Sequence, residues 1–216
     1  DKRRDEIRSL IDAQEKLTDE INLALDKAAT LSELEDIYRP YRPKRKTRAS
    51  IAKEKGLEPL ANDILKQEKG FDPSKSAVDY IDEEKEVTSV EDAIQGAMDI
   101  IAELVSDNAE IRKRIRNLTN ANGVLVSVAT DEEKDSVYKN YYDYKEPVKK
   151  IAGHRVLAVN RGEKEGFLKV SVETDSEKPL NSIFRAMITD KNQLCSDIIR
   201  EACTDAYLSL IHISEP

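Results

Sequence analysis

The residues with the clearest capacity for chemistry form one basic run, YRPYRPKRKTR, at positions 38–48. Arginine binds phosphate through paired hydrogen bonds, and lysine adds a compact positive charge. The two prolines stiffen the run, so it would lose little conformational entropy on meeting a ligand. The run therefore predicts contact with a nucleic-acid backbone, without readout of base sequence. The candidate contacts are Arg39, Arg42, Lys44, Arg45, Lys46 and Arg48, with Tyr38 and Tyr41 as weaker candidates for stacking on bases.

The alternative is that these cations are used inside the protein. Residues 37–55 contain eight basic side chains and one acidic, whereas residues 56–110 contain four basic and fifteen acidic. Opposite charges on neighbouring segments attract, so the run could be a structural turn whose charges pair with the acidic segment. Tyr38 and Tyr41 would then pack the turn against neighbouring helices. The net charge of −8 does not decide between the two interpretations, because charge is unevenly distributed along the chain.

Two further clusters, one of basic and one of tyrosine side chains, are candidates for nucleic-acid contact. Arg112, Lys113, Arg114 and Arg116 fall on an expected helix, where positions 112 and 116 share a face. A solvated helix face explains this cluster, but Arg112 and Arg116 become weaker candidates for phosphate contact if the fold places them beside the 38–48 run. Tyr138, Tyr141, Tyr142 and Tyr144 crowd together before Pro147. We interpret them as aromatic packing of a short helix, with a base-stacking platform as the alternative.

Motifs for catalysis, cofactors or metals are not found. His154 and His212 lack motif partners, and neither a phosphate-binding P-loop nor a dinucleotide fingerprint occurs. Cys195 and Cys203 fit no zinc or redox spacing. We therefore expect no enzyme activity, no catalytic residues, no cofactor and no metal. No apolar run approaches the roughly 18 residues that a membrane span needs, so we expect a cytoplasmic protein without membrane contact.

The elements that would position these residues are mostly helices. Helix start signals occur at Ser32 with Glu35 and at Thr88 with Glu91, the second preceding a helix over 89–105. Two strands are expected, at 123–129 and 167–173, and a helix is expected from Pro147 to about Asn160. The pattern predicts a mainly α fold: a multi-helix orthogonal bundle with a helix-turn-helix-like section and a small two-strand β insert.

Four segments carry a family resemblance. They are LEDIYRPYRPKRKTRASIAKEKGLEPLAN (Leu34–Asn62), VEDAIQGAMDIIAE (Val90–Glu103), YYDYKEPVKKIAGHRVLAVNRGEKEG (Tyr141–Gly166) and REACTDAYLSLI (200–211). Together they resemble the Tex family of bacterial transcription accessory proteins. The resemblance covers essentially all of residues 1–210. It divides the chain into a helical region, 1–118, and an α+β extension, 119–211. The last residues, 212–216, look foreign to the family.

The resemblance implies that the chain is an excerpt of a longer protein. Family members continue into an RNase-H-like domain, helix-hairpin-helix modules and an OB-fold domain, to which RNA and DNA binding is largely attributed. It implies a non-catalytic part of a nucleic-acid-binding protein, with RNA or DNA as partners and transcription or translation machinery as a further possibility. The alternative function is a scaffold or protein-interaction module that positions those domains without nucleic-acid contact of its own.

Overall fold

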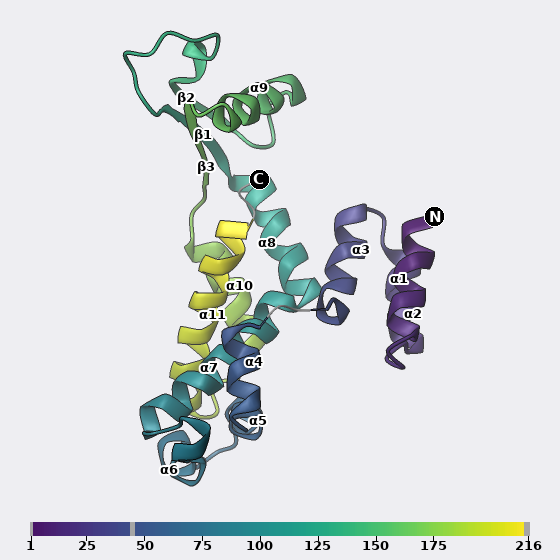
Figure 1. Cartoon of the computed structure of the whole chain (residues 1–216), viewed down its shortest axis with the longest axis vertical. Helices are drawn as coiled ribbons and strands as arrows, with labels where there is room; N and C mark the ends of the chain where they lie inside the picture. The colour runs from purple at the N-terminus through teal and green to yellow at the C-terminus, as the bar shows by residue number, and fades with distance from the viewer. Residues whose placement is uncertain (1, 44–45, 214–216) are drawn as a thin grey trace. The chain divides into compact units, whose positions relative to one another are not determined.

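The computed structural model describes residues 2–43 and 46–213, with side chains as far as residue 211. These residues fold into helices and a small antiparallel sheet, so the expected mainly α fold with a β insert is confirmed (Figure 1). The helices are α1 (Lys2–Asp12), α2 (Asp19–Lys27), α3 (Leu31–Tyr38), α4 (Arg48–Glu54), α5 (Glu58–Lys66), α6 (Pro73–Ala77), α7 (Val90–Asp107), α8 (Ala109–Asn122), α9 (Gly153–Lys164), α10 (Glu177–Met187) and α11 (Gln193–Ile213). Short 3-10 turns are η1 (Arg39–Tyr41), η2 (Val78–Tyr80), η3 (Glu83–Lys85) and η4 (Lys139–Tyr141).

The chain forms two compact units. The first consists of residues up to Lys113 together with Ile183–Tyr207, and the second of Arg114–Ser182 together with the residues from Leu208. The return of 183–207 to the first unit is a long-range arrangement that local sequence patterns do not encode. The domain limits at 118 and 211, the helix-turn-helix-like section and the orthogonal crossing of helices stay predictions.

In the first unit, α1, α2 and α3 lie side by side and share one apolar core (Figure 1). The core residues recur at helical spacing, which is why each helix buries one stripe. They are Ile7, Ile11, Leu25, Ala28, Leu34 and Tyr38. Arg4 also holds α1 against α2, because its guanidinium donates to the carbonyls of Leu25 and Ala28.

A second group of helices in the same unit packs around α7. Small residues on α7 allow close approach: a Cβ on Gly96 would lie 2.2 Å from Leu57 Cδ1. Two buried amide side chains then join the C-terminal end of α5 and the residues after it to the end of α10 and to the residue before α11. The Gln67 side chain donates to the Met187 carbonyl at 2.8 Å. Asn192 Nδ2 donates to the carbonyls of Glu68 and Phe71, both at 2.7 Å.

Two helix starts differ from the sequence-based positions. The capping box of α3 uses Thr30 with Glu33, two residues before the expected pair. The N-cap of α7 is Ser89, whose hydroxyl accepts from the Asp92 amide, one residue later than expected. Each segment offers several hydroxyls and carboxylates at similar spacing, so composition alone does not select the register.

The second unit contains a three-stranded antiparallel sheet in the order β2-β1-β3. β1 (Val124–Ala129) and β3 (Leu168–Glu173) match the two expected strands, and β2 (Asp143–Pro147) is an additional edge strand. β2 pairs through Val126 opposite Lys145. Its polar sequence, DYKEP, gives little strand signal because one side of an edge strand faces solvent. The expected helix from Pro147 is therefore wrong at its start: α9 begins at Gly153.

Candidate nucleic-acid interface

The 38–48 run links the end of α3 to the start of α4, and its residues Arg39–Tyr41 form the 3-10 turn η1. Pro40 is the second residue of the 3-10 turn η1, where the lack of an amide donor leaves no hydrogen bond unmade. It also ends α3. The next helix starts at Thr47, whose hydroxyl accepts from the Ser50 amide at 3.0 Å. The predicted contacts Lys44 and Arg45 lie outside the described residues. The local sequence thus explains the turn, while the direction of its side chains depends on their partners.

Arg39 and Arg42 both pair with carboxylates of the same unit. Arg39 Nε lies 3.1 Å from Asp107 Oδ1 at the end of α7. Arg42 donates to Glu35 of α3, which also accepts from Arg3 Nε at 2.7 Å. These pairs place the first two arginines of the turn against α3 and α7.

Both tyrosines of the turn pack into the α1–α3 core. Tyr38 is buried, and the guanidiniums of Arg3 and Arg42 lie 5.7 and 5.6 Å from its ring centre. Tyr41 is partly buried against the same core, and its carbonyl accepts from Gln14 Nε2 at 2.7 Å. Tyr38 therefore packs the turn against neighbouring helices, and its ring has little surface left for a nucleic-acid base.

Lys46 and Arg48 are paired but much more exposed. Lys46 Nζ lies 3.4 Å from Glu54 Oε2, with 67% of the lysine side chain accessible. Arg48 lies 3.0 Å from Asp205 and 3.8 Å from Asp99, with 69% of its side chain accessible. Exposed ion pairs contribute little free energy, about 0–1 kcal/mol each. These two cations could exchange their carboxylates for phosphates at small cost.

Arg112 and Lys113, the first two cations of the second basic cluster, pair with carboxylates of α3. Arg112 Nε donates to Asp36 Oδ1 at 2.9 Å, and Nη1 donates to the Ser106 carbonyl at 3.2 Å. Only 16% of the Arg112 side chain and 7% of the Asp36 side chain are accessible. Lys113 Nζ lies 2.9 Å from Glu33 Oε1. The start of α8 and the basic turn therefore both contact α3. Arg116 also takes part in an interaction.

These contacts shift the titration of two α3 carboxylates. Hydrogen bonding from Lys113, followed by the Ala29 amide, holds the pKa of Glu33 below its ordinary value. Hydrogen bonding from Arg3, and more weakly from Arg42, lowers the pKa of Glu35 despite the opposing effect of burial. Both carboxylates are thus charged at neutral pH and attract the cations around them.

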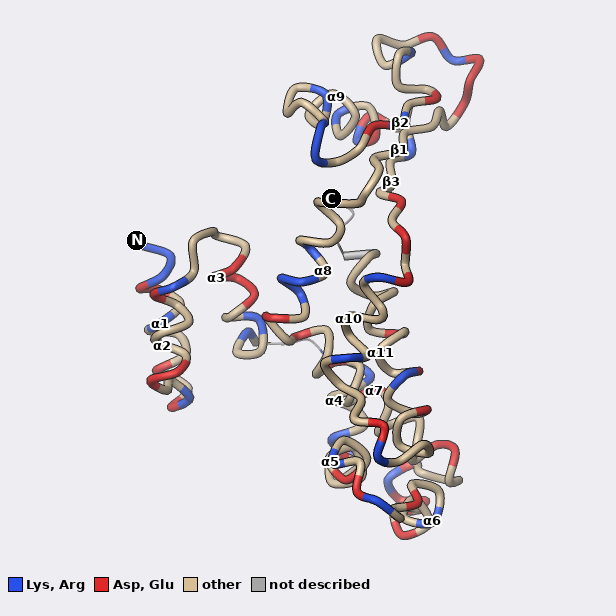
Figure 2. The backbone as a smooth tube through the Cα atoms, turned by 180° about the vertical axis from the view of Figure 1, so that it is seen from behind, with Lys and Arg blue, Asp and Glu red and all other residues tan. Residues whose placement is uncertain are grey.

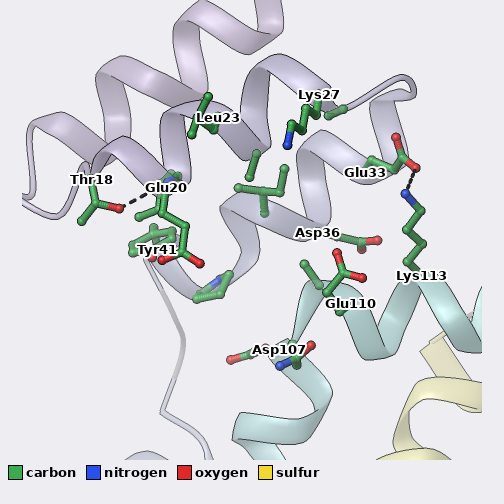
Figure 3. Close-up of a pocket in the computed structure, with 17 residues that line it drawn as sticks. Thr18, Glu20, Leu23, Lys27, Glu33, Asp36, Tyr41, Asp107, Glu110 and Lys113 are labelled. Atoms are coloured by element: carbon green, nitrogen blue, oxygen red, sulfur yellow. Dashed lines mark hydrogen bonds and ion pairs between the residues drawn. The ribbon is translucent and has the colours of Figure 1, made fainter. Parts of the chain in front are cut away.

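An open groove of about 910 Å³ lies beside the turn, between α2, α3 and the junction of α7 with α8 (Figure 3). Its lining includes apolar side chains such as Ile21, Leu23 and Ile37. The charged lining residues are Glu20, Glu33, Asp36, Asp107, Glu110, Lys27 and Lys113. Because carboxylates outnumber ammonium groups, this groove does not favour phosphate.

The sequence interpretation missed the acidic partners that come from α3 itself. Glu33, Glu35 and Asp36 immediately precede the basic run, within reach of the turn and of α8. The signal was present as three acids in LSELEDIY, but only the fold shows that α8 meets the same helix. The acidic segment 56–110 supplies Asp99 and Asp107, and α11 supplies Asp205.

Among the residues that the structure describes, no group of three or more His, Cys, Asp or Glu side chains is arranged to hold a metal ion. No helix in the described part of the chain combines the length and apolar character needed to cross a membrane.

Residues 68–211, which include the sheet and the helices from α6 into α11, match the family model described as Tex central region-like. The chain belongs to the Tex family.

Individual relatives agree with that assignment. The protein YdcI of Bacillus subtilis is 43% identical over 212 residues, covering 97% of this chain and 30% of the relative. The transcriptional accessory protein Tex of Neisseria gonorrhoeae is 36% identical over 165 residues, 76% of this chain and 21% of the relative. The human S1 RNA-binding domain-containing protein 1 is 27% identical over 168 residues, 73% of this chain and 16% of the relative. The chain therefore spans less than a third of the length of these relatives.

Proposed function

We propose that this chain is a non-catalytic scaffold segment of a Tex-like nucleic-acid-binding transcription accessory protein, in which the 38–48 turn serves as an internal clamp. One observation carries the proposal: Arg39, Arg42, Lys46 and Arg48 each have a carboxylate partner, and Arg112 pairs with the largely buried Asp36. Arg39 and Arg42 tie the turn to α7 and α3, and Arg112 ties α8 to α3; the clamp consists of these three ion pairs together. It would hold the helical segment in one arrangement for the nucleic-acid-binding parts of the whole protein.

The role in transcription and the RNA or DNA partners are supported by the names of the relatives. One is called a transcriptional accessory protein, and another an S1 RNA-binding domain-containing protein. Protein partners in the transcription or translation machinery and a cytoplasmic location belong to the same proposal. Absence of catalysis is tested by incubating the chain with RNA and magnesium, where intact RNA is expected and cleavage would contradict it.

A second candidate function is direct phosphate contact by the turn. The accessible side chains of Lys46 and Arg48 favour it, because weak surface pairs are readily exchanged. In this function Lys46 and Arg48, with Lys44 and Arg45, would meet the backbone, while Arg39 and Arg112 would remain structural.

Two sets of variants separate these functions. One changes Lys44, Arg45, Lys46 and Arg48 to Gln, and the other changes Arg39 and Arg112 to Met. The clamp predicts that the second set lowers thermal stability while the first leaves the salt dependence of duplex DNA binding unchanged. Phosphate contact by the turn predicts that the first set reduces the log–log salt slope by roughly 3–4 units. A stable Arg39→Met/Arg112→Met protein would contradict the clamp.

A further inference from the structure

The exposed side of α9, a helix of the second unit, carries a stripe of cations. None of these cations takes part in the ion pairs described above. At 3.6 residues per turn, positions 154, 157, 161 and 164 lie on one side of this helix. His154, Leu157, Arg161 and Lys164 are all exposed, and Leu157 keeps 71% of its surface accessible. The stripe spans about 15 Å along the helix axis.

Two more exposed lysines precede the helix. Lys149 and Lys150 lie in a turn closed by the Lys150 amide, which donates to the Pro147 carbonyl at 2.9 Å. Their neighbours Val148 and Ile151 pack against the core of the second unit, so the two lysines are left exposed. Figure 2 shows blue stretches along α9 and the turn that leads into it.

Nearby carboxylates are occupied elsewhere. Glu163 Oε1 accepts from the Val170 amide of β3 at 3.0 Å. Glu146 pairs with Arg155 at 2.9 Å and accepts from the Tyr144 hydroxyl. Glu165 lies near the Tyr138 hydroxyl, whose pKa is raised by burial and then by this carboxylate. Within the part of the chain that the structure describes, none of these acids forms an ion pair with Lys149, Lys150, Arg161 or Lys164.

The packing of α9 fixes which way the stripe faces. Val159 is fully buried on the opposite side of the helix. Gly162 lies so close to the sheet that a Cβ there would be 2.6 Å from Leu168 Cδ1. A helix held this closely cannot rotate its cations inward without breaking the core around Leu125, Tyr138, Val159 and Leu168.

We propose that the face formed by Lys149, Lys150, His154, Leu157, Arg161 and Lys164 is a binding site for single-stranded nucleic acid. The four Lys and Arg side chains would contact backbone phosphates. This surface shares no residue with the 38–48 turn, and the proposal does not depend on the function of that turn.

Single strands fit this face better than duplexes because the stripe is not purely cationic. The apolar Leu157 and the His154 ring lie among the cations and offer surface to base faces, which only unpaired nucleotides expose. A duplex would present phosphates to the cations but would leave Leu157 against a hydrated backbone.

The test measures fluorescence anisotropy of a labelled oligouridine with the chain over a series of salt concentrations. The variant K149Q/K150Q/R161Q/K164Q should reduce the log–log salt slope by about three units, because each phosphate contact on a single strand contributes about 0.7. Leu157→Ala should weaken binding and leave the slope unchanged, since it removes no phosphate contact. The matched control K53Q/K69Q/K75Q/K191Q removes the same charge from exposed lysines elsewhere and should bind as the unmodified chain does.

Four results would overturn the proposal: no binding of the oligouridine, equal loss of slope in the control, tighter binding of duplex than of single-stranded DNA, or equal competition by polyglutamate. All substitutions are at exposed positions, and unchanged thermal unfolding of each variant shows that lost binding is not lost structure. Comparable binding of single-stranded DNA and oligouridine supports a backbone site.

Discussion

Replacing Arg112 by Met should destabilise the first unit more than any exposed charge change on α8. Arg112 donates to Asp36 at 2.9 Å and to the Ser106 carbonyl at 3.2 Å, and both members of the ion pair are largely inaccessible. Methionine fills a similar volume but leaves Asp36 without its Arg112 partner. Removing one member of a buried pair costs 3–5 kcal/mol, and the residual access to Arg112 places the expected loss at about 3 kcal/mol.

Thermal unfolding followed by circular dichroism measures this loss. In a chain of this size 1 kcal/mol shifts Tm by roughly 2–4 °C, so Arg112→Met should lower Tm by roughly 6–12 °C. The control is Arg114→Met, the same substitution at an exposed position of α8. The double variant Asp36→Leu/Arg112→Met should recover most of the loss, because neither member of this pair is then left charged without the other. Equal Tm values for Arg112→Met and Arg114→Met would refute the reasoning.

Three further outcomes are expected. Asn192→Ala should lower the free energy of unfolding, measured in urea, by about 2–3 kcal/mol, because the Asn192 side chain caps α11 and donates to two carbonyls. Lys191→Ala is the control. An equal effect of the two substitutions would contradict this prediction. The pKa of Glu35 is lowered from its ordinary 4.5, so its stabilisation is present above that pH and is lost as pH falls through the folded value. Stability measured through that range should therefore fall less steeply in Glu35→Gln, and identical pH profiles would argue against it. Burial raises the pKa of Cys203 to about 12, so a disulfide reagent at about pH 8 should modify it only after unfolding; fast reaction of the native chain that disappears in Cys203→Ser would show the thiol to be accessible.

The elements most readable from the sequence are those with strong local signals. α7 was expected because small and apolar residues recur at helical spacing from Val90, and β1 because valines alternate from Val124. Edge strand β2 was not predicted, because a polar strand with one side in solvent shows no alternation of apolar residues. The predicted helix caps were displaced by one or two residues, because neighbouring residues offer equivalent hydroxyls. Periodicity is a local property, and it fails where several local solutions have similar energy.

The sequence by itself predicted a cationic segment between two helices, because Pro40 disfavours continuation of α3 and Thr47 can cap α4. It could not determine what those cations face. Only the tertiary structure brings Asp107 and Asp205 to the cations of this segment. The reason is physical. The energy of a charge depends on distances across the fold, and those distances are set by the packing of helices that lie far apart in the sequence.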